Sequence, residues 1–318
     1  MLRRMKEMKR LGLLLMGLCW VWTAWGQETY PFVQRDTTTL LLDLYRPAEP
    51  ANGYTVVHIY GGGFIGGSRT KQWDADYCRR LAEMGYTAVA MDYRLGLRST
   101  YTDGKSKLQA LKDAFYMAAA DCSAAVRYLV EHGKELGIAA DKIILEGSSA
   151  GAITALMTDF GRCNGLAFAA ELPEGWKPAG VVAYSGAIYS ETGSLKWAQA
   201  PAPTLLFHGE VDKIVPYKQI VLGRKGLYGS SAITKKMEKY EYPYCIYRLK
   251  KLGHEVSVAG PMTTGELEFF VQQYVKDGRR LYEDVTMRDA SVGPSKWTDM
   301  RLRDLYKKPK SIDKRSDK

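Results

Sequence analysis

The sequence predicts an α/β fold built on a mostly parallel sheet. From about residue 37 onward, short apolar and β-branched runs alternate with helical stretches, which is the pattern of repeated βαβ units. Several apolar runs are continuous rather than alternating, as expected for strands buried on both faces. The chain has 318 residues, 46% hydrophobic and 25% charged. That composition is typical of a soluble globular protein with a large core, and a single domain of this class can reach such a length.

The strands and helices can be placed from these runs. Strands are expected at residues 38–45, 54–60, 87–92, 142–146, 180–184, 204–208 and 244–249. Helices are expected where apolar residues recur at three- and four-residue spacing, over residues 72–84, 114–132 and from 264 to near Gly278. Neither an internal repeat nor a low-complexity linker divides this region, so it is expected to form one domain over residues 27–278.

The first 26 residues differ from the rest of the chain. Residues 1–10 are rich in Lys and Arg, residues 11–21 form an apolar run, and Ala24-Trp25-Gly26 places small residues at a cleavage site. This pattern predicts a secretory signal peptide cleaved before Gln27, and hence a periplasmic or extracellular protein. The apolar run is shorter than the roughly 20 residues that span a bilayer, so no stable membrane insertion is expected after cleavage. Cys19 suggests a lipoprotein as an alternative, but Leu18 is bulky for that signal.

Most of the net charge of +10 lies at the two ends of the chain. The signal segment is basic, and so is the polar tail expected over residues 279–318, which is rich in Lys and Arg near its end. The tail is expected to be a solvated and partly disordered terminus, with contact to a membrane surface or polyanion as the alternative. The body between the ends is close to neutral, so a nucleic-acid partner is not expected.

The cysteines predict either disulfides or buried thiols. Cys78, Cys122, Cys163 and Cys245 remain after signal cleavage, and an oxidising compartment would allow up to two bridges. Cys122 and Cys163 are the preferred pair, because each is expected on a helix beside the same strand. Buried free thiols are the alternative. None of the four has the spacing of a zinc motif, so no metal or other cofactor is expected.

Ser149 is the candidate nucleophile. It is the central serine of Gly147-Ser148-Ser149-Ala150-Gly151, which follows the apolar run 143–145 and precedes the helix-like run 152–157. A serine on a sharp turn between strand and helix is a nucleophile elbow. The glycines allow strand and helix to approach closely around the strained turn, and the helix N-terminus favours developing negative charge.

A glycine run is expected to bind the oxyanion of an acyl-transfer reaction. Tyr60-Gly61-Gly62-Gly63-Phe64 directly follows an expected strand. Backbone amides stabilise such an oxyanion when they point to where the charge develops, and glycines leave that space open. We assign the amides of Gly62, Gly63 and Ala150 to this role.

Asp212 and His254 are the expected acid and base. Asp212 follows the expected strand 204–208, and His254 follows the strand 244–249 after Gly253. A serine needs a base to take its proton, and the base needs a carboxylate to hold its tautomer. Glu210 is the alternative acid. Of the other histidines, His58 lies mid-strand, His132 is expected at a helix end, and His208 is expected to shape the Asp212 loop.

Together these segments resemble the α/β-hydrolases of the carboxylesterase/lipase type, close to the hormone-sensitive-lipase-like group with its His-Gly-Gly-Gly-Phe loop. The resemblance covers about residues 37–276 and includes Asp92-Tyr93-Arg94-Leu95. It implies a doubly wound sheet with helices on both faces, a Ser-Asp-His triad, and no metal or cofactor. Tyr60 stands where that group has His, a difference that concerns loop geometry and substrate range. The prolyl-oligopeptidase type of peptidase shares the same core.

The expected activity is hydrolysis of a carboxylic ester through an acyl-enzyme on Ser149. Export suggests small esters or glycan-linked acyl groups as substrates. The 42 positions between the acid and the base hold Tyr217, Leu227, Tyr228 and Tyr240, which suggest a packed helix, with an acyl pocket or lid as the alternative. A serine exopeptidase and a non-catalytic binding protein on the same fold remain the alternative functions.

Overall fold

A computed structural model describes residues 27–97, 106–288, 290–291 and 295–305. The expected signal peptide and the Lys/Arg-rich end beyond residue 305 lie outside the described residues. Within the described part of the chain, no helix is both long enough and apolar enough to cross a membrane.

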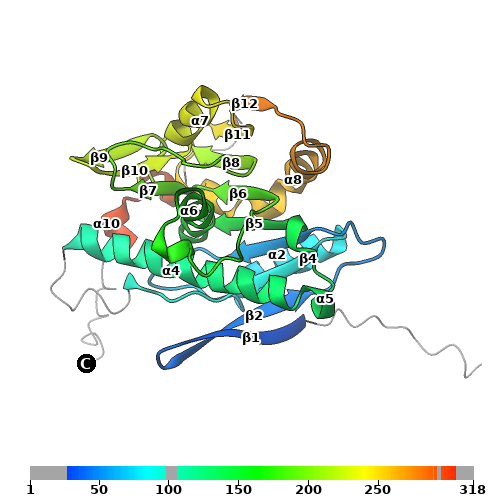
Figure 1. Cartoon of the computed structure of the whole chain (residues 1–318). Helices are drawn as coiled ribbons and strands as arrows, with labels where there is room; N and C mark the ends of the chain where they lie inside the picture. Colours follow the sequence, from blue (N-terminus) through cyan, green and yellow to red (C-terminus); the bar gives the residue numbers. More distant parts are fainter. Residues whose placement is uncertain (1–26, 98–105, 289, 292–294, 306–318) are drawn as a thin grey trace, which may run out of the picture.

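The centre of the molecule is a nine-stranded sheet in the order β1-β2-β4-β3-β5-β6-β8-β11-β12 (Figure 1). The strands are β1 Gln27–Arg35, β2 Thr38–Tyr45, β3 Thr55–Ile59, β4 Thr87–Met91, β5 Ile143–Ser148, β6 Gly180–Tyr184, β8 Thr204–Gly209, β11 Tyr244–Leu249 and β12 Tyr282–Met287. β2 is antiparallel to β1 and β4, and every pairing from β4 to β12 is parallel. The predicted mostly parallel sheet is confirmed, and all seven expected strands are present.

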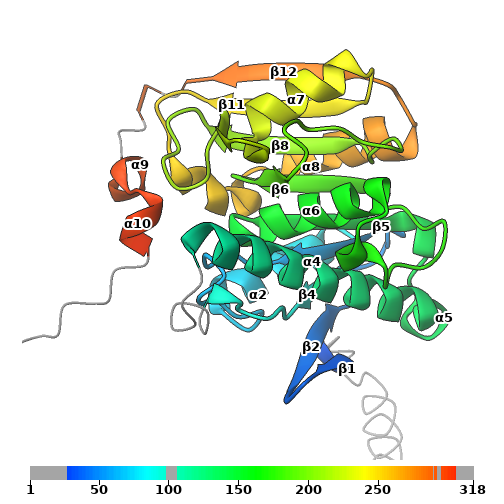
Figure 2. The same ribbon diagram turned by 60° about the vertical axis from the view of Figure 1, so that its left-hand side comes forward.

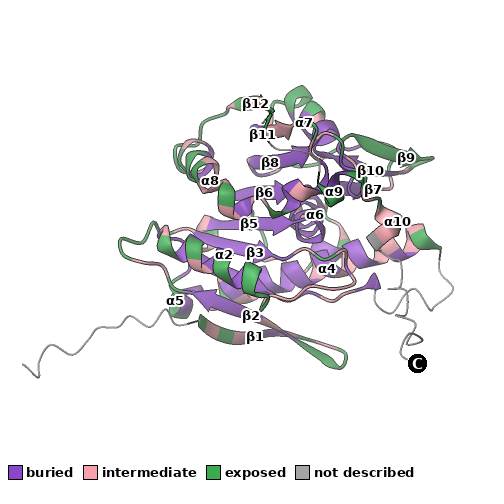
Figure 3. Cartoon of the chain, turned by 180° about the vertical axis from the view of Figure 1, so that it is seen from behind, coloured by how far each residue is buried: buried purple, intermediate pink, exposed green. Residues whose placement is uncertain are grey.

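Helices cover both faces of this sheet (Figure 2). They are α2 Gln72–Glu83, α4 Lys107–Glu131, α5 Gly133–Leu136, α6 Ala150–Asn164, α7 Ser230–Lys239 and α8 Thr264–Phe270, which continues as the π-helix η5 Val271–Lys276. Short 3₁₀ turns are η1 Ala140–Lys142, η2 Ala167–Ala169, η3 His254–Val258 and η4 Gly260–Met262. Burial separates two cores, because successive strand residues face opposite sides. Val57 packs with residues of α4 and α6, whereas Val56 packs with residues of α2 and α8. The central strands are buried throughout (Figure 3).

A small second sheet and two short C-terminal helices complete the described chain. The second sheet has the order β7-β10-β9, with β7 Ala187–Ser190, β9 Gln219–Leu222 and β10 Lys225–Gly229. β9 and β10, together with α7, lie in the region between Asp212 and His254 where a packed helix was expected. The two last helices are α9 Lys296–Asp299 and α10 Leu302–Leu305.

The tail was expected to begin at residue 279 as a solvated terminus, and this is wrong for much of its described part. β12 pairs in parallel with β11 over six residues, from Tyr282 opposite Tyr244 to Met287 opposite Leu249. α9 packs on the loop that follows β11. The catalytic domain therefore extends beyond Gly278. β12 escapes sequence reasoning because it is an edge strand with mostly exposed side chains, so it lacks the apolar run of a central strand.

The preferred Cys122–Cys163 disulfide is also wrong, because all four described cysteines are free and buried. Cys122 on α4 lies against Thr158 of α6. Cys163 is five residues further along α6, which turns it by about 140° to another face of the helix. There its sulfur lies 3.1 Å from Nη2 of Arg162.

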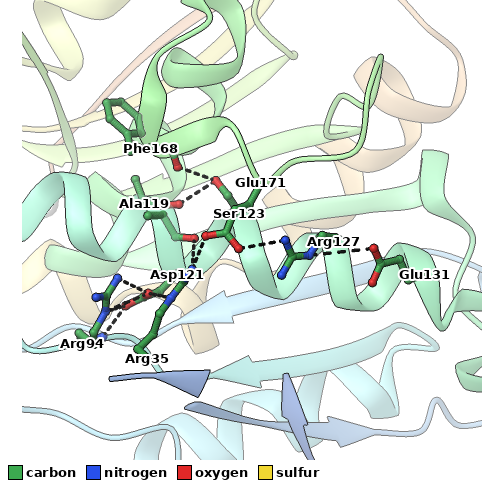
Figure 4. A network of polar contacts seen from close by, with 10 residues as sticks. Arg35, Arg94, Ala119, Asp121, Ser123, Arg127, Glu131, Phe168 and Glu171 are labelled. Carbon is green, nitrogen blue, oxygen red and sulfur yellow. Dashed lines mark hydrogen bonds and ion pairs between the residues drawn. The ribbon is translucent and has the colours of Figure 1, made fainter. Parts of the chain in front are cut away.

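A buried carboxylate ties the edge hairpin to the body (Figure 4). Asp121 of α4 is fully buried and accepts hydrogen bonds from Arg35 at the end of β1 and from Arg94 after β4. The second arm of Arg35 reaches Glu171. Arginine side chains suit such multidentate contacts with carboxylates. The Asp92-Tyr93-Arg94-Leu95 segment is thus fixed on α4, directly behind the glycine loop.

Candidate active site

Ser149 lies at a strained turn between β5 and α6. Its backbone has φ 51° and ψ −110°, which non-glycine residues rarely adopt. The two flanking glycines are required by close approach of backbone atoms. A Cβ on Gly147 would lie 2.3 Å from the carbonyl carbon of Gly151, and a Cβ on Gly151 would lie 1.9 Å from the oxygen of Ile59 on β3. The helix can approach the sheet, and the strained turn can form, only with these residues.

The three predicted triad residues meet at this turn. Oγ of Ser149 is 2.8 Å from Nε2 of His254, and Nδ1 of His254 is 2.8 Å from Oδ2 of Asp212. The carboxylate can only accept a hydrogen bond, so Nδ1 of His254 carries a hydrogen and donates a hydrogen bond to Oδ2 of Asp212. Nε2 is then free to accept the proton of the Ser149 hydroxyl. This is the arrangement in which a histidine acts as general base toward a serine.

The Asp212 carboxylate is held by backbone amides of its own loop and by a second histidine. Its Oδ1 accepts hydrogen bonds from the amides of Ile214 and Val215 at 2.8 and 3.0 Å. Burial favours a raised pKa, but contacts from His208 and His254 outweigh it and hold the pKa of Asp212 well below its usual range. Asp212 is therefore ionised at neutral pH.

His208 has the structural role expected for it. Its Nε2 lies 3.2 Å from the carbonyl oxygen of Val215 and 3.5 Å from Oδ2 of Asp212, and Nδ1 lies 2.8 Å from Oγ of Ser230 on α7. The imidazole thus joins the Asp212 loop to α7. Asp212, and not the alternative Glu210, contacts His254.

The glycine loop follows β3 and faces the same point. Gly62 has φ 138° and Gly63 has φ 63°. A Cβ on Gly62 would lie 2.0 Å from the carbonyl oxygen of Gly66, so this turn excludes other residues. Gly62 and Gly63 border one cavity with Ser149 and His254, and Gly63 and Ala150 border another with Ser149. The three predicted oxyanion residues thus surround the serine.

Tyr60 supports this loop from below. Its ring is buried and stacks on Tyr93 with ring centroids 4.5 Å apart. The Tyr93 hydroxyl donates to the carbonyl oxygen of Tyr60 at 3.0 Å. Tyr60 therefore packs under the glycine turn instead of entering the cavity beside Ser149, which is a structural role.

Two cavities of different character open on either side of Ser149. The first has a volume of about 40 Å³ and apolar walls that include Phe115, Ile153 and Leu227. The second has a volume of about 330 Å³ and is bordered by Lys71, Asp74, Trp73 and Trp297 as well as by the catalytic residues. Among the described residues, no group of three or more His, Cys, Asp or Glu side chains is arranged to hold a metal ion.

The chain matches two family models, each over less than half of its length. One is described as BD-FAE and matches residues 42–167, and the other is described as Phospholipase/Carboxylesterase and matches residues 105–245. No curated protein is significantly similar in sequence. Among solved structures, the thermophilic esterase Est2 of the planctomycete Thermogutta terrifontis with bound propionate has a TM-score of 0.59. It is 21% identical, and the alignment covers 78% of this chain and 94% of that chain. Its paraoxon-phosphorylated form has a TM-score of 0.55, with the same identity and coverage.

The chain has the α/β-hydrolase fold. The sheet order, the elbow after β5 and the acid and base after β8 and β11 agree with it. Within this fold, Ser149, His254 and Asp212 are in contact in the arrangement of a serine nucleophile, its base and its acid.

Sequence reasoning missed the contribution of the C-terminal segment to this site. Trp297 borders the larger cavity and Leu302 borders the smaller one. Thr298 donates a hydrogen bond to Glu255, the neighbour of His254, at 2.5 Å. The available signal was the recurrence of apolar residues at Trp297, Met300, Leu302 and Leu305 in a largely polar tail.

Proposed function

We propose that this α/β-hydrolase cleaves carboxylic esters of short acids. The observation that carries the proposal is the continuous contact from Ser149 through His254 to Asp212 at a nucleophile elbow, beside a glycine loop. The match to the Phospholipase/Carboxylesterase model supports ester hydrolysis over other acyl transfers.

The geometry supports a two-step acyl transfer. Oγ of Ser149 attacks the ester carbonyl while Nε2 of His254 takes its proton, and the amides of Gly62, Gly63 and Ala150 stabilise the oxyanion. His254 returns the proton to the leaving alcohol, which departs and leaves an acyl group on Ser149. Water then attacks this acyl-enzyme while His254 takes its proton. The bond between the acyl carbon and Oγ of Ser149 breaks, His254 returns the proton to Oγ, and the acid is released. Asp212 stays ionised and stabilises the imidazolium in both steps.

The two cavities suggest which part of the ester lies where. The small apolar cavity fits a short acyl chain, whereas the larger one, with its charged and aromatic border, fits a polar alcohol. The Thermogutta esterase has been solved with propionate and with butyrate bound, which supports a short acyl group. Two half-exposed indoles, Trp73 and Trp297, face a cavity that also contains Lys71 and Asp74. This combination suits the apolar faces and hydroxyls of a sugar, so acylated carbohydrates belong to the proposed substrates.

We place this activity outside the cytoplasm. The support for export is the basic and apolar pattern of residues 1–26. An exopeptidase is less favoured, because Asp74, the carboxylate that borders the larger cavity, already lies 3.0 Å from Nε2 of His58 and is not available for a substrate amine.

Labelling with a fluorophosphonate tests the proposal directly. The probe should modify Ser149, as located by mass spectrometry, and His254→Ala should abolish labelling. Ser149→Ala should lower the turnover of p-nitrophenyl acetate by several orders of magnitude with an unchanged circular dichroism spectrum. Ser148→Ala is the matched control and should keep the label. A folded wild-type protein that takes no label would contradict the proposal and favour a non-catalytic binding protein.

A further inference from the structure

We propose that the C-terminal strap, residues 295–305, limits through Leu302 the length of the acyl chain that the active site accepts in an ester substrate. This inference rests on the proposed ester hydrolysis and assigns its specificity to a segment outside the strands and loops that carry the triad.

Leu302 forms part of the wall of the small cavity beside Ser149. The other apolar walls come from Leu111 and Phe115 of α4, Ile153 of α6, Ile214 beside the acid, and Leu227 of β10. Leu302 is the first residue of α10, and Leu111 and Phe115 lie in the N-terminal half of α4. The strap therefore supplies one side of a pocket whose remaining sides belong to the hydrolase domain.

The strap is anchored on the loops of both the base and the acid. The buried Thr298 side chain donates to Glu255, and a Cβ on Gly253 would lie 2.7 Å from Cα of Thr298. The backbone of the strap thus packs directly on the residue before His254. On the acid side, the amide of Leu302 lies 3.4 Å from the carbonyl oxygen of Lys213, next to Asp212.

Hydrogen bonds within the strap fix its turn. The amide of Ser295 donates to Oγ1 of Thr298 at 2.9 Å, and Oγ of Ser295 accepts from the amide of Trp297 at 3.1 Å. This capping arrangement satisfies helix-terminal amides. The Lys213–Asp299 ion pair is exposed, so it adds little. Packing and the Thr298 contact therefore hold Leu302 in position.

The size of the cavity sets the expected specificity. A volume of about 40 Å³ holds only a few atoms, since one water-sized probe needs roughly 10–15 Å³. An acetyl to butyryl chain fits with small adjustments, whereas a longer chain must displace a wall. Leu302 is half-buried, so its truncation opens the cavity without removing a fully buried core residue.

The test compares kcat/KM for p-nitrophenyl acetate, butyrate, hexanoate and octanoate in the full-length protein. For the wild-type protein we expect kcat/KM to fall for esters longer than butyrate. Leu302→Ala should raise the octanoate-to-acetate ratio about tenfold or more, because each methylene accommodated in a pocket is worth roughly tenfold or more in kcat/KM. Leu302→Phe should lower the butyrate-to-acetate ratio, which gives a second test if Leu302→Ala fails to fold.

Two control variants separate this effect from general loosening. Arg301→Ala changes an exposed neighbour on the same strap, and Trp297→Ala changes the border of the other cavity. Both should keep the wild-type chain-length ratio. The inference is wrong if Leu302→Ala keeps that ratio, or if Trp297→Ala shifts it equally. A wild-type protein that hydrolyses none of the four esters overturns the proposed function, and this inference with it.

Discussion

At the residue scale, the site depends on a carboxylate kept ionised by its neighbours. Asp212 receives two backbone amides on one oxygen and two imidazoles near the other. These contacts keep the Asp212 carboxylate ionised and fix its orientation. They also fix the tautomer of His254, because an ionised carboxylate accepts a hydrogen bond and therefore requires the hydrogen on Nδ1.

Asp212→Asn tests that role. The amide can present its NH₂ group to His254, which favours the tautomer with the proton on Nε2 and leaves no base for Ser149. We expect kcat for p-nitrophenyl acetate to fall about 10³- to 10⁴-fold, with a much smaller change in KM. Glu210→Gln is the control, since Glu210 is the nearby alternative acid, and steady-state kinetics should show near wild-type rates. Equal losses in both variants would contradict the assignment.

The residues that perform the chemistry were predictable because each lies in a short motif beside a recognisable strand. Ser149 and the glycine loop carry their own local signals. Leu302 and Thr298 do not, because their roles arise from packing against residues 43 or more positions away in the sequence. Nothing in the polar sequence around them specifies that contact.

At the element scale, the crossing of β3, β5 and α6 is the tightest part of the site. The carbonyl oxygen of Ile59 would lie 1.9 Å from a Cβ on Gly151. Neither β3 nor β5 can move aside, because both are central strands paired on each side. The conformation of the elbow is therefore supported by the sheet itself.

Gly151→Ala should destabilise the protein severely, by more than about 4 kcal/mol, because its methyl group overlaps buried backbone. Gly265→Ala is the matched control on α8. A Cβ there meets nothing within 4 Å, and the change should be neutral or stabilising by up to about 1 kcal/mol. Urea unfolding followed by circular dichroism measures both. A Gly151→Ala protein with wild-type stability would contradict the steric overlap between a Cβ at this position and the backbone of β3.

The burial of each strand explains which strands could be predicted from the sequence. Strands buried on both faces, such as β3 and β5, appear as continuous apolar runs. β1 has only one buried residue, Phe32, and β12 has none. Edge strands of this kind depend on pairing with a neighbour, so their own residues carry little signal.

At the scale of the whole molecule, the sheet separates two cores, and a charged cluster lies buried on the α2 side. His58 of β3 contacts Glu146 of β5 through Nδ1 at 2.6 Å and Asp74 of α2 through Nε2 at 3.0 Å. Both partners are carboxylates, so both ring nitrogens donate and the imidazole is charged. The cluster joins two strands and a helix directly beneath the larger cavity, which Asp74 borders.

This cluster should make stability depend on pH near neutrality. Burial alone would lower the pKa of His58, but Glu146 and Asp74 raise it from 6.5 to about 10. A raised pKa means that the folded chain holds a proton that the unfolded chain releases above pH 6.5. The stabilisation is complete below pH 6.5 and is lost as pH rises toward 10. The free energy of unfolding should fall by up to about 1.4 kcal/mol per pH unit in this window.

Urea unfolding at pH 6.0, 7.0, 7.75 and 8.5 measures this slope. The range lies below the pH at which ionisation of the buried thiols would change the free energy of unfolding. Burial raises the pKa values of the Cys78 and Cys122 thiols above their usual value of 9.0, so the stability that these thiols contribute is lost only above pH 9. Glu146→Gln removes one of the two carboxylates that raise the pKa of His58, so its slope should be shallower. Val57→Ala, on the opposite face of β3, should lower stability by about 1–3 kcal/mol at every pH and keep the wild-type slope. A wild-type slope of zero between pH 6.5 and 8.5 would contradict a charged His58 in the folded protein.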